Sequence, residues 1–151
     1  MVKWNKEAII EANIEKVWEL FQDRNIKQIM PKIEEHQLLE NNDDEAGAKH
    51  AQTYYEGSQL QTYIVETLAY DDTPDRKHRQ IRFIMGQSFE VMYSFTLLKA
   101  GENRTKFIYQ GHNKGVNLVG KAMLLAGNKK KAEETVTKFM ERVELAALNN
   151  D

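Results

Sequence analysis

The pattern of hydrophobic and polar positions over roughly the first thirty residues predicts one strand followed by two short helices. Over residues 1–12 apolar positions alternate with polar ones, which predicts a strand with one inward face. Asn13 is a favourable N-cap, and the apolar positions after it are spaced for a helix that ends near Asp23. A second helix is predicted over residues 24–30, and Pro31 ends it. The inward positions of the strand are Trp4, Ala8, Ile10 and Ala12.

From residue 32 onward the period changes to two, and residues typical of turns separate the alternating segments. The connections are too short for parallel crossovers, so the pattern predicts an antiparallel meander. With the first strand this makes a sheet of seven strands. The six later strands are predicted at residues 32–40, 48–56, 60–70, 76–85, 89–99 and 105–112.

The last three strands alternate most clearly. Their apolar residues fall on odd numbers, and hairpins that pair residues summing to about 174 and about 204 place all of them on one face. In the segment 60–70 two apolar sets compete, and the inward set stays open. The odd-numbered positions are Ile81, Phe83, Met85, Phe89, Val91, Tyr93, Phe95, Leu97, Phe107 and Tyr109.

The last part of the chain, from Gly115 to Leu148, has apolar residues at steps of three and four and predicts one continuous amphipathic helix. Its apolar stripe should pack on the odd-numbered face of the sheet. Gly115, Gly120 and Gly127 weaken the first part of this helix, which suggests a mobile gate. Apolar residues between 116 and 125 are flanked by lysines, including the run 129–131. This pattern fits transient contact with an anionic membrane or with a partner surface, and it also fits a helix that covers the core with its lysines in solvent.

Length and composition fit one soluble domain, predicted at residues 1–148 and followed by a short polar tail at 149–151. No apolar run is long enough for stable membrane insertion, and no signal peptide is recognisable, so a cytoplasmic location is expected. The absence of cysteine excludes disulfides, thiolate nucleophiles and cysteine-based metal sites. A formal charge of −2 argues against nucleic-acid binding.

Candidate catalytic and metal-binding residues are few. His36 and His50 would be opposite or diagonal neighbours if their hairpin pairs residues summing to about 86–88, although two separate strand residues explain them equally well. His112 is a candidate general base near a pocket mouth. The acidic groups at 43–45 and 71–75 fit turns better than calcium sites. No metal site and no cofactor are therefore expected, and catalytic residues remain unknown.

The order of elements, with the segment Ile10–Trp18, the run Val65–Arg79 and the long terminal helix, resembles the START and birch-pollen-allergen-like (SRPBCC) superfamily. The resemblance is greatest to small bacterial proteins grouped with polyketide cyclases and dehydrases. It implies an α+β helix-grip fold: a seven-stranded curved antiparallel sheet around a long C-terminal helix, with two short helices after the first strand. The chain departs from the plant allergen branch, because its loop 41–47 holds one glycine, and it lacks the tryptophan-centred motif of the chaperone-activator-like branch.

This resemblance implies a cavity between sheet and helix that accepts an apolar small molecule or lipid, as a carrier or a sensor. One alternative is an enzyme of the polyketide cyclase or dehydrase type that uses the same cavity without metal or nucleotide. Another is a protein-interaction domain with a filled core; the ligand and the oligomeric state stay open. The expected cavity-lining residues are Phe83, Val91, Tyr93, Phe95, Phe107 and Tyr109 from the sheet, and Met123, Leu124 and Gly127 from the helix.

Overall fold

The structure is a computed structural model that describes residues 1–22, 24–40, 46–56, 58–127 and 129–149. Within these ranges the chain forms strands and helices in the order expected from the sequence, except that two helices follow the last strand. The strands are β1 (Val2–Ile10), β2 (Ile33–Glu40), β3 (Lys49–Glu56), β4 (Gln59–Asp72), β5 (Arg76–Met85), β6 (Phe89–Gly101) and β7 (Arg104–Gly115). The helices are α1 (Ile14–Glu19), α2 (Ile26–Ile29), α3 (Leu118–Ala126) and α4 (Lys129–Asn149).

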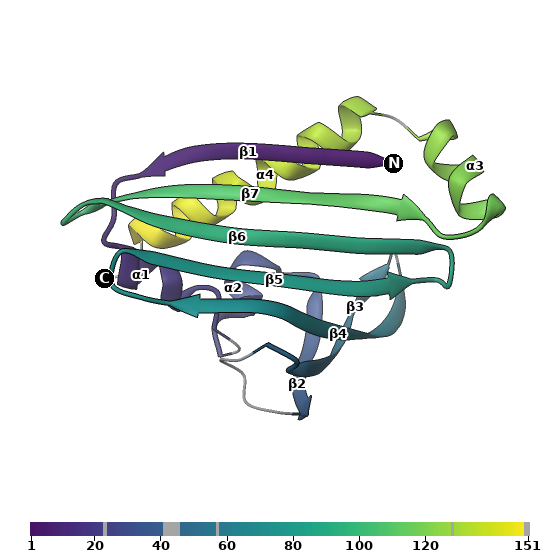
Figure 1. Ribbon diagram of the computed structural model, residues 1–151, viewed down its shortest axis with the longest axis horizontal. Helices are drawn as coiled ribbons and strands as arrows, with labels where there is room; N and C mark the ends of the chain where they lie inside the picture. The colour runs from purple at the N-terminus through teal and green to yellow at the C-terminus, as the bar shows by residue number, and fades with distance from the viewer. Residues whose placement is uncertain (23, 41–45, 57, 128, 150–151) are drawn as a thin grey trace.

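The described strands form one antiparallel sheet in the order β1-β7-β6-β5-β4-β3-β2. The sheet is curved, and α1, α2 and α4 lie on its concave side, whereas α3 lies beyond one end of the strands (Figure 1). The first strand pairs with the last, so the meander is closed at that edge by the N-terminal segment. The predicted helix-grip fold is confirmed.

The strand register confirms the predicted inward face. Phe83 pairs with Val91 and Phe95 pairs with Tyr109, which are the pairings expected from the two hairpins. In β4 the open question is resolved: Val65 is buried and Ile64 is exposed, so the odd set points inward over this part. A β-bulge between Thr67 and Ala69 then shifts the register, and Tyr70, although even-numbered, packs against the core.

The prediction of one continuous helix from Gly115 to Leu148 is wrong. Strand β7 continues to Gly115, and the side chain of Asn117 caps a separate helix by accepting a hydrogen bond from the Gly120 amide at 2.8 Å. Gly127 is extended, with φ −71° and ψ 157°, and ends α3 before α4 begins. The spacing of apolar residues therefore keeps the helical period of 3.6 across the whole segment, although the residues that cap α3 divide it into two helices.

The main core joins the concave face of the sheet to α1, α2 and α4. Asn13 caps α1 as predicted, accepting from the Glu15 amide at 2.9 Å. From α4, Phe139 meets Phe95 and Phe107 with ring centroids 5.7 and 6.4 Å apart. The buried residues that α4 contributes are Val136, Phe139, Met140, Val143 and Ala147. In the part of the chain that the structure describes, no helix combines the length and apolarity needed to cross a membrane.

Candidate functional site

A cavity of about 640 Å³ lies between the concave face of the sheet and α4, within the range of small-molecule pockets. The curvature of the sheet creates this space, because a straight helix cannot fill the whole concave side. The lining residues come from β1, the segment after α2, the sheet strands and α4. They are Val2, Trp4, Met30, Pro31, Lys32, Ile33, Gln52, Phe83, Tyr93, Tyr109, Asn113, Ala132, Thr135, Val136, Lys138, Phe139 and Arg142.

One wall of this cavity is aromatic. Tyr109 lies at its centre, with ring centroids 4.8 Å from Phe139, 5.6 Å from Trp4 and 6.0 Å from Tyr93. The Trp4 ring lies directly over Gly111, where a Cβ atom would come within 2.4 Å of it. A side chain at position 111 would therefore displace the indole, so this glycine allows Trp4 to form part of the wall.

The hydroxyl of Tyr109 has no hydrogen-bond partner among the residues that the structure describes. Burial raises the pKa of this phenol above its ordinary value, so it stays protonated across the physiological range. The Tyr109 side chain is half-buried, and a phenol in such a place normally finds an acceptor. The arrangement therefore offers one hydrogen-bond donor or acceptor to whatever occupies the cavity.

The charged lining residues that the structure describes are Lys32, Lys138 and Arg142, with no aspartate or glutamate among them. Arg142 is partly buried and donates from Nη1 to the backbone oxygen of Ile29 at 3.0 Å, which holds the guanidinium against the α2 segment. Lys32 and Lys138 are exposed. The cavity thus combines an apolar interior with a cationic border.

The residues predicted to line a cavity occupy four different places. Phe83, Tyr93 and Tyr109 lie on the wall just described, and Phe95 borders a space of only about 30 Å³ deeper in the core. Val91 and Phe107 are buried in the hydrophobic clusters. Met123, Leu124 and Gly127 belong to α3 and its end, outside the linings of the described cavities.

Helix α4 contributes lining residues that were not expected from the sequence. Ala132, Thr135, Val136, Phe139 and Arg142 recur at steps of three and four, so they follow one stripe of the helix. The apolar part of this stripe is visible in the sequence, but the helical residues expected to line the cavity belong to α3 and its end. The periodicity is sufficient to find the α4 residues once the break between the two helices is known.

His112 alternates with Tyr109 along β7 and points to the other face of the sheet. Its Nε2 atom lies 3.2 Å from Glu90, which also accepts from Arg82 at 3.2 Å. The hydrogen bond with His112 lowers the pKa of Glu90; burial opposes this, Arg82 adds to it, and the net shift is downward. His112 also lines a groove of about 440 Å³ together with Lys3, Asn5 and Gln110, and Trp4 and Tyr93 border the same groove.

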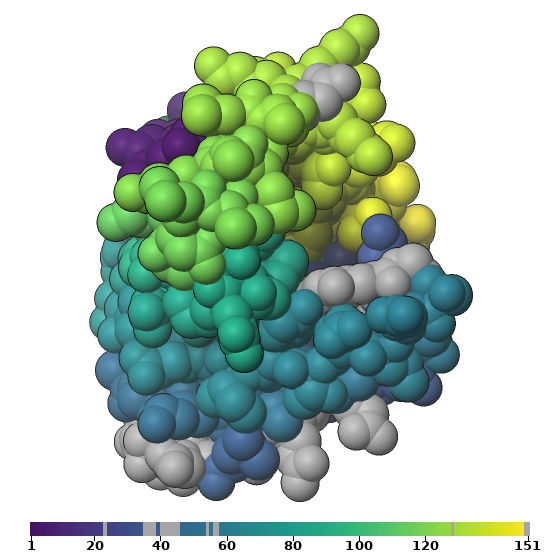
Figure 2. Space-filling model, turned by 90° about the vertical axis from the view of Figure 1, so that its right-hand side faces the viewer, coloured from purple at the N-terminus to yellow at the C-terminus, as the bar shows by residue number. Residues whose placement is uncertain are grey.

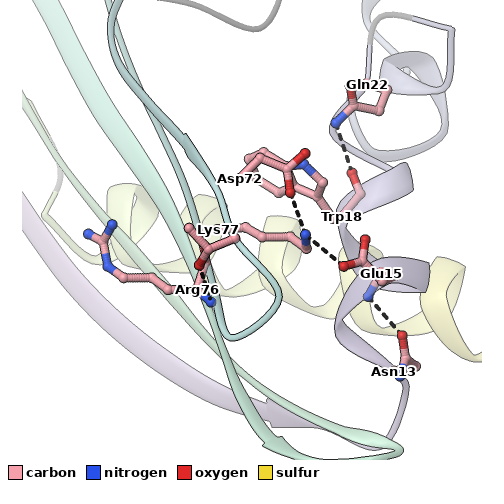
Figure 3. A network of polar contacts seen from close by, with 8 residues as sticks. Asn13, Glu15, Trp18, Gln22, Asp72, Arg76 and Lys77 are labelled. Atoms are coloured by element: carbon pink, nitrogen blue, oxygen red, sulfur yellow. Dashed lines mark hydrogen bonds and ion pairs between the residues drawn. The ribbon is translucent and has the colours of Figure 1, made fainter.

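Figure 3 shows a polar network around a buried lysine, which the alternation of polar and apolar residues does not predict. The Lys77 side chain is 2% exposed and reaches Glu15 on α1 at 2.8 Å and Asp72 on β4. Burial alone lowers the pKa of Lys77, but the hydrogen bonds and charges of Asp72 and Glu15 outweigh it and raise the pKa. The network fastens α1 to the β4–β5 turn, and none of its three residues lines the cavity.

The structure does not support a metal site at His36 and His50 in the part of the chain that it describes. His50 pairs with Leu38 and His36 with Gln52, so the two histidine backbones are diagonal neighbours. His50 is buried, and the side chain of His36 lies outside the description, as do residues 43–45. Among the described residues no group of three histidine, cysteine or acidic side chains is placed to hold a metal ion.

No protein-family model matches the sequence. No curated protein matches it either. Solved structures do resemble it. A START superfamily protein from Mycobacterium smegmatis is 17% identical, with 95% of each chain covered and a TM-score of 0.71. The major latex-like protein of Panax ginseng is 16% identical, with 97% of each chain covered and a TM-score of 0.70.

Norcoclaurine synthase from Thalictrum flavum, solved with dopamine and hydroxybenzaldehyde, is 11% identical. The alignment covers 99% of this chain and 87% of the synthase, with a TM-score of 0.65. The structural neighbours are START and birch-pollen-allergen-like proteins, and this chain has their fold. At these identities the likeness concerns the fold.

Proposed function

We propose that the protein encloses an apolar small molecule or lipid that carries an acidic group, as a carrier or a sensor. The observation that supports this is the composition of the cavity of about 640 Å³, whose wall is aromatic and whose described charged residues are all cationic. Pockets with an apolar wall and a few placed polar groups are typical of small-molecule sites. The shared fold with a synthase solved in complex with two aromatic compounds agrees with such a use.

The placement of the polar groups gives the ligand an orientation. The apolar body would lie against Trp4, Tyr109 and Phe139, where the rings are closest. The acidic group would lie toward Lys138 and Arg142, because a carboxylate or phosphate is best held by charge-assisted hydrogen bonds. The Tyr109 hydroxyl would donate a hydrogen bond to a polar atom in the middle of the ligand.

A matched pair of helix variants tests whether the cavity is the binding site. Thr135 and Thr137 are both exposed residues of α4, but only Thr135 lines the cavity. With anilinonaphthalene sulfonate and oleate as probes, T135W should weaken binding by more than about tenfold because the indole occupies the cavity, whereas T137W should bind as the wild type does. Equal binding by both variants would refute the cavity as the site.

The acidic group is tested separately. The protein should bind oleate more tightly than oleyl alcohol, and K138Q/R142Q should reduce that preference by about tenfold. The control K27Q changes an exposed lysine of α2 outside the lining. Binding of both compounds with the same affinity would leave an apolar cavity but exclude the acidic specificity. Native mass spectrometry of protein purified from its own host would then identify the natural ligand.

A cyclase or dehydrase type of enzyme is the second candidate. It is favoured by one observation, the protonated Tyr109 hydroxyl without a described partner in the cavity, since such a phenol can polarise a carbonyl. If the captured compound is converted on incubation and Y109F abolishes the conversion while retaining binding, the enzymatic function is correct. A protein that is always recovered empty would instead favour the interaction domain. The cytoplasmic location stays a prediction from the sequence.

A further inference from the structure

Helix α3 exposes almost all of its large apolar side chains. Leu118 and Leu125 are 85% and 87% exposed, and Val119 and Met123 are 62% and 56% exposed. Val116, just before the helix, is 46% exposed. Single exposed leucines are common on protein surfaces, but so many on nine consecutive helical residues form a contiguous patch, which marks an interaction site.

The position of α3 is fixed by close backbone contacts. The Val116 amide donates to the backbone oxygen of Ser88 at 2.9 Å, and Asn117 caps the helix. Gly120 is buried, and a Cβ atom there would come within 2.1 Å of the Ser88 oxygen. The glycine face of the helix is therefore held against the end of the sheet, and this contact turns the leucine face toward solvent.

The chain on both sides of this patch is rich in lysine. No aspartate or glutamate occurs between Glu102 and Glu133, and after Lys106 this interval contains five lysines, at 114, 121, 129, 130 and 131. The whole chain has a formal charge of −2, so this end opposes the overall balance. Leucines and lysines on one short helix and its flanks suit the interface of an anionic bilayer, where apolar side chains enter and lysines meet headgroups.

Helix α3 also connects two elements that line the cavity. Asn113 near the end of β7 and Ala132 in the first turn of α4 both line the cavity, and α3 is the segment that connects these two elements. Figure 2 looks at this end of the molecule, with the light green α3 segment beside the start of α4. A surface that receives α3 would thus lie next to two elements that line the cavity.

We propose that α3 and the adjoining lysines dock the protein on the surface of an anionic phospholipid bilayer. Leu118, Val119, Met123 and Leu125 enter the interfacial region, and the lysines contact acidic headgroups, without any segment crossing the membrane. Docking by itself requires no cavity ligand. Transfer of a lipid between bilayer and cavity is the part that rests on the proposed function.

Sedimentation with vesicles tests the docking on the full chain. Vesicles of phosphatidylcholine with about 30 mol% phosphatidylglycerol should retain the wild type at low salt, and pure phosphatidylcholine should bind it at least about tenfold more weakly. L118S/L125S should lose binding by about tenfold or more, and K121E/K129E likewise. The matched controls are L60S/L145S, at residues 51% and 59% exposed elsewhere, and K27E/K99E.

Three results would overturn the proposal. The first is wild-type binding that ignores phosphatidylglycerol, and the second is equal loss in the patch variants and in their controls. The third is a concentration-dependent dimer, seen by sedimentation velocity, that L118S/L125S abolishes, because the patch would then join two copies of the chain. If L118S/L125S leaves the bilayer but still binds oleate as the wild type does, docking is supported separately from the cavity.

Discussion

The contact between Gly111 and Trp4 allows a sharp test of how the cavity wall is built. In G111A the new Cβ atom would lie 2.4 Å from the Trp4 ring and 2.6 Å from the backbone oxygen of Met92. The oxygen belongs to the central sheet and cannot retreat. The indole must therefore move away from the strand, and β7 must shift to clear the Met92 oxygen.

The size of the effect follows from these distances. Ordinary contact begins at 3.4 Å, so relief of the clash with the ring requires a displacement of 3.4 − 2.4 = 1.0 Å, and the Met92 oxygen requires the strand to distort as well. Overpacking of this kind costs about 1–3 kcal/mol, and the reduced entropy of the unfolded chain returns about 0.4–1 kcal/mol. A net loss of about 1–2 kcal/mol corresponds to about 2–8 °C in the melting temperature of a chain of this size.

The control for this experiment is G101A, in the β6–β7 hairpin. There a Cβ atom would meet only the Cβ of Arg104 at 3.5 Å, which is ordinary contact. Both variants change the unfolded chain in the same way, so the difference between their melting temperatures isolates the steric cost. G111A should also weaken binding of anilinonaphthalene sulfonate. Equal stability of the two variants, with unchanged binding, would refute the account of Trp4 as a wall held in place by the glycine.

Three further predictions concern buried and charged groups. The Lys77 side chain is buried, whereas Glu15 and Asp72 are 63% and 47% exposed. E15Q/D72N leaves the buried lysine charge without its partners and should destabilise the protein by about 1–3 kcal/mol in urea unfolding, whereas K77M removes that charge and should cost less. A larger loss in K77M than in E15Q/D72N would contradict this reasoning. The pKa of Glu90 is lowered from its ordinary value of 4.5, so its contribution to stability is fully present above that pH and is lost as pH falls through the lowered pKa of the folded state. The stability gap between wild type and E90Q should therefore close in acid, and a constant gap would disprove the linkage. F139A removes a buried ring from the wall and should cost about 3–5 kcal/mol in urea unfolding while admitting bulkier probes, and a variant as stable as the wild type would refute the packing role.

The strands and their inward face were determined largely by local sequence. Alternation in β5, β6 and β7 follows a period of two, and short turns leave little choice but antiparallel neighbours, so the pairing of Phe83 with Val91 follows from chain geometry. The N-cap of α1 likewise depends on residues next to it in the chain.

Tertiary structure decided what periodicity cannot encode. The bulge after Thr67 brings Tyr70 to the core, and the lining contributed by α4 depends on where the helix crosses the curved sheet. The position of α3 at the end of the sheet depends on Gly120 fitting against Ser88, a contact between residues far apart in the chain. Local sequence therefore determined which residues are apolar and in what order, while the packing of distant segments determined which of them face the cavity, the core or the solvent.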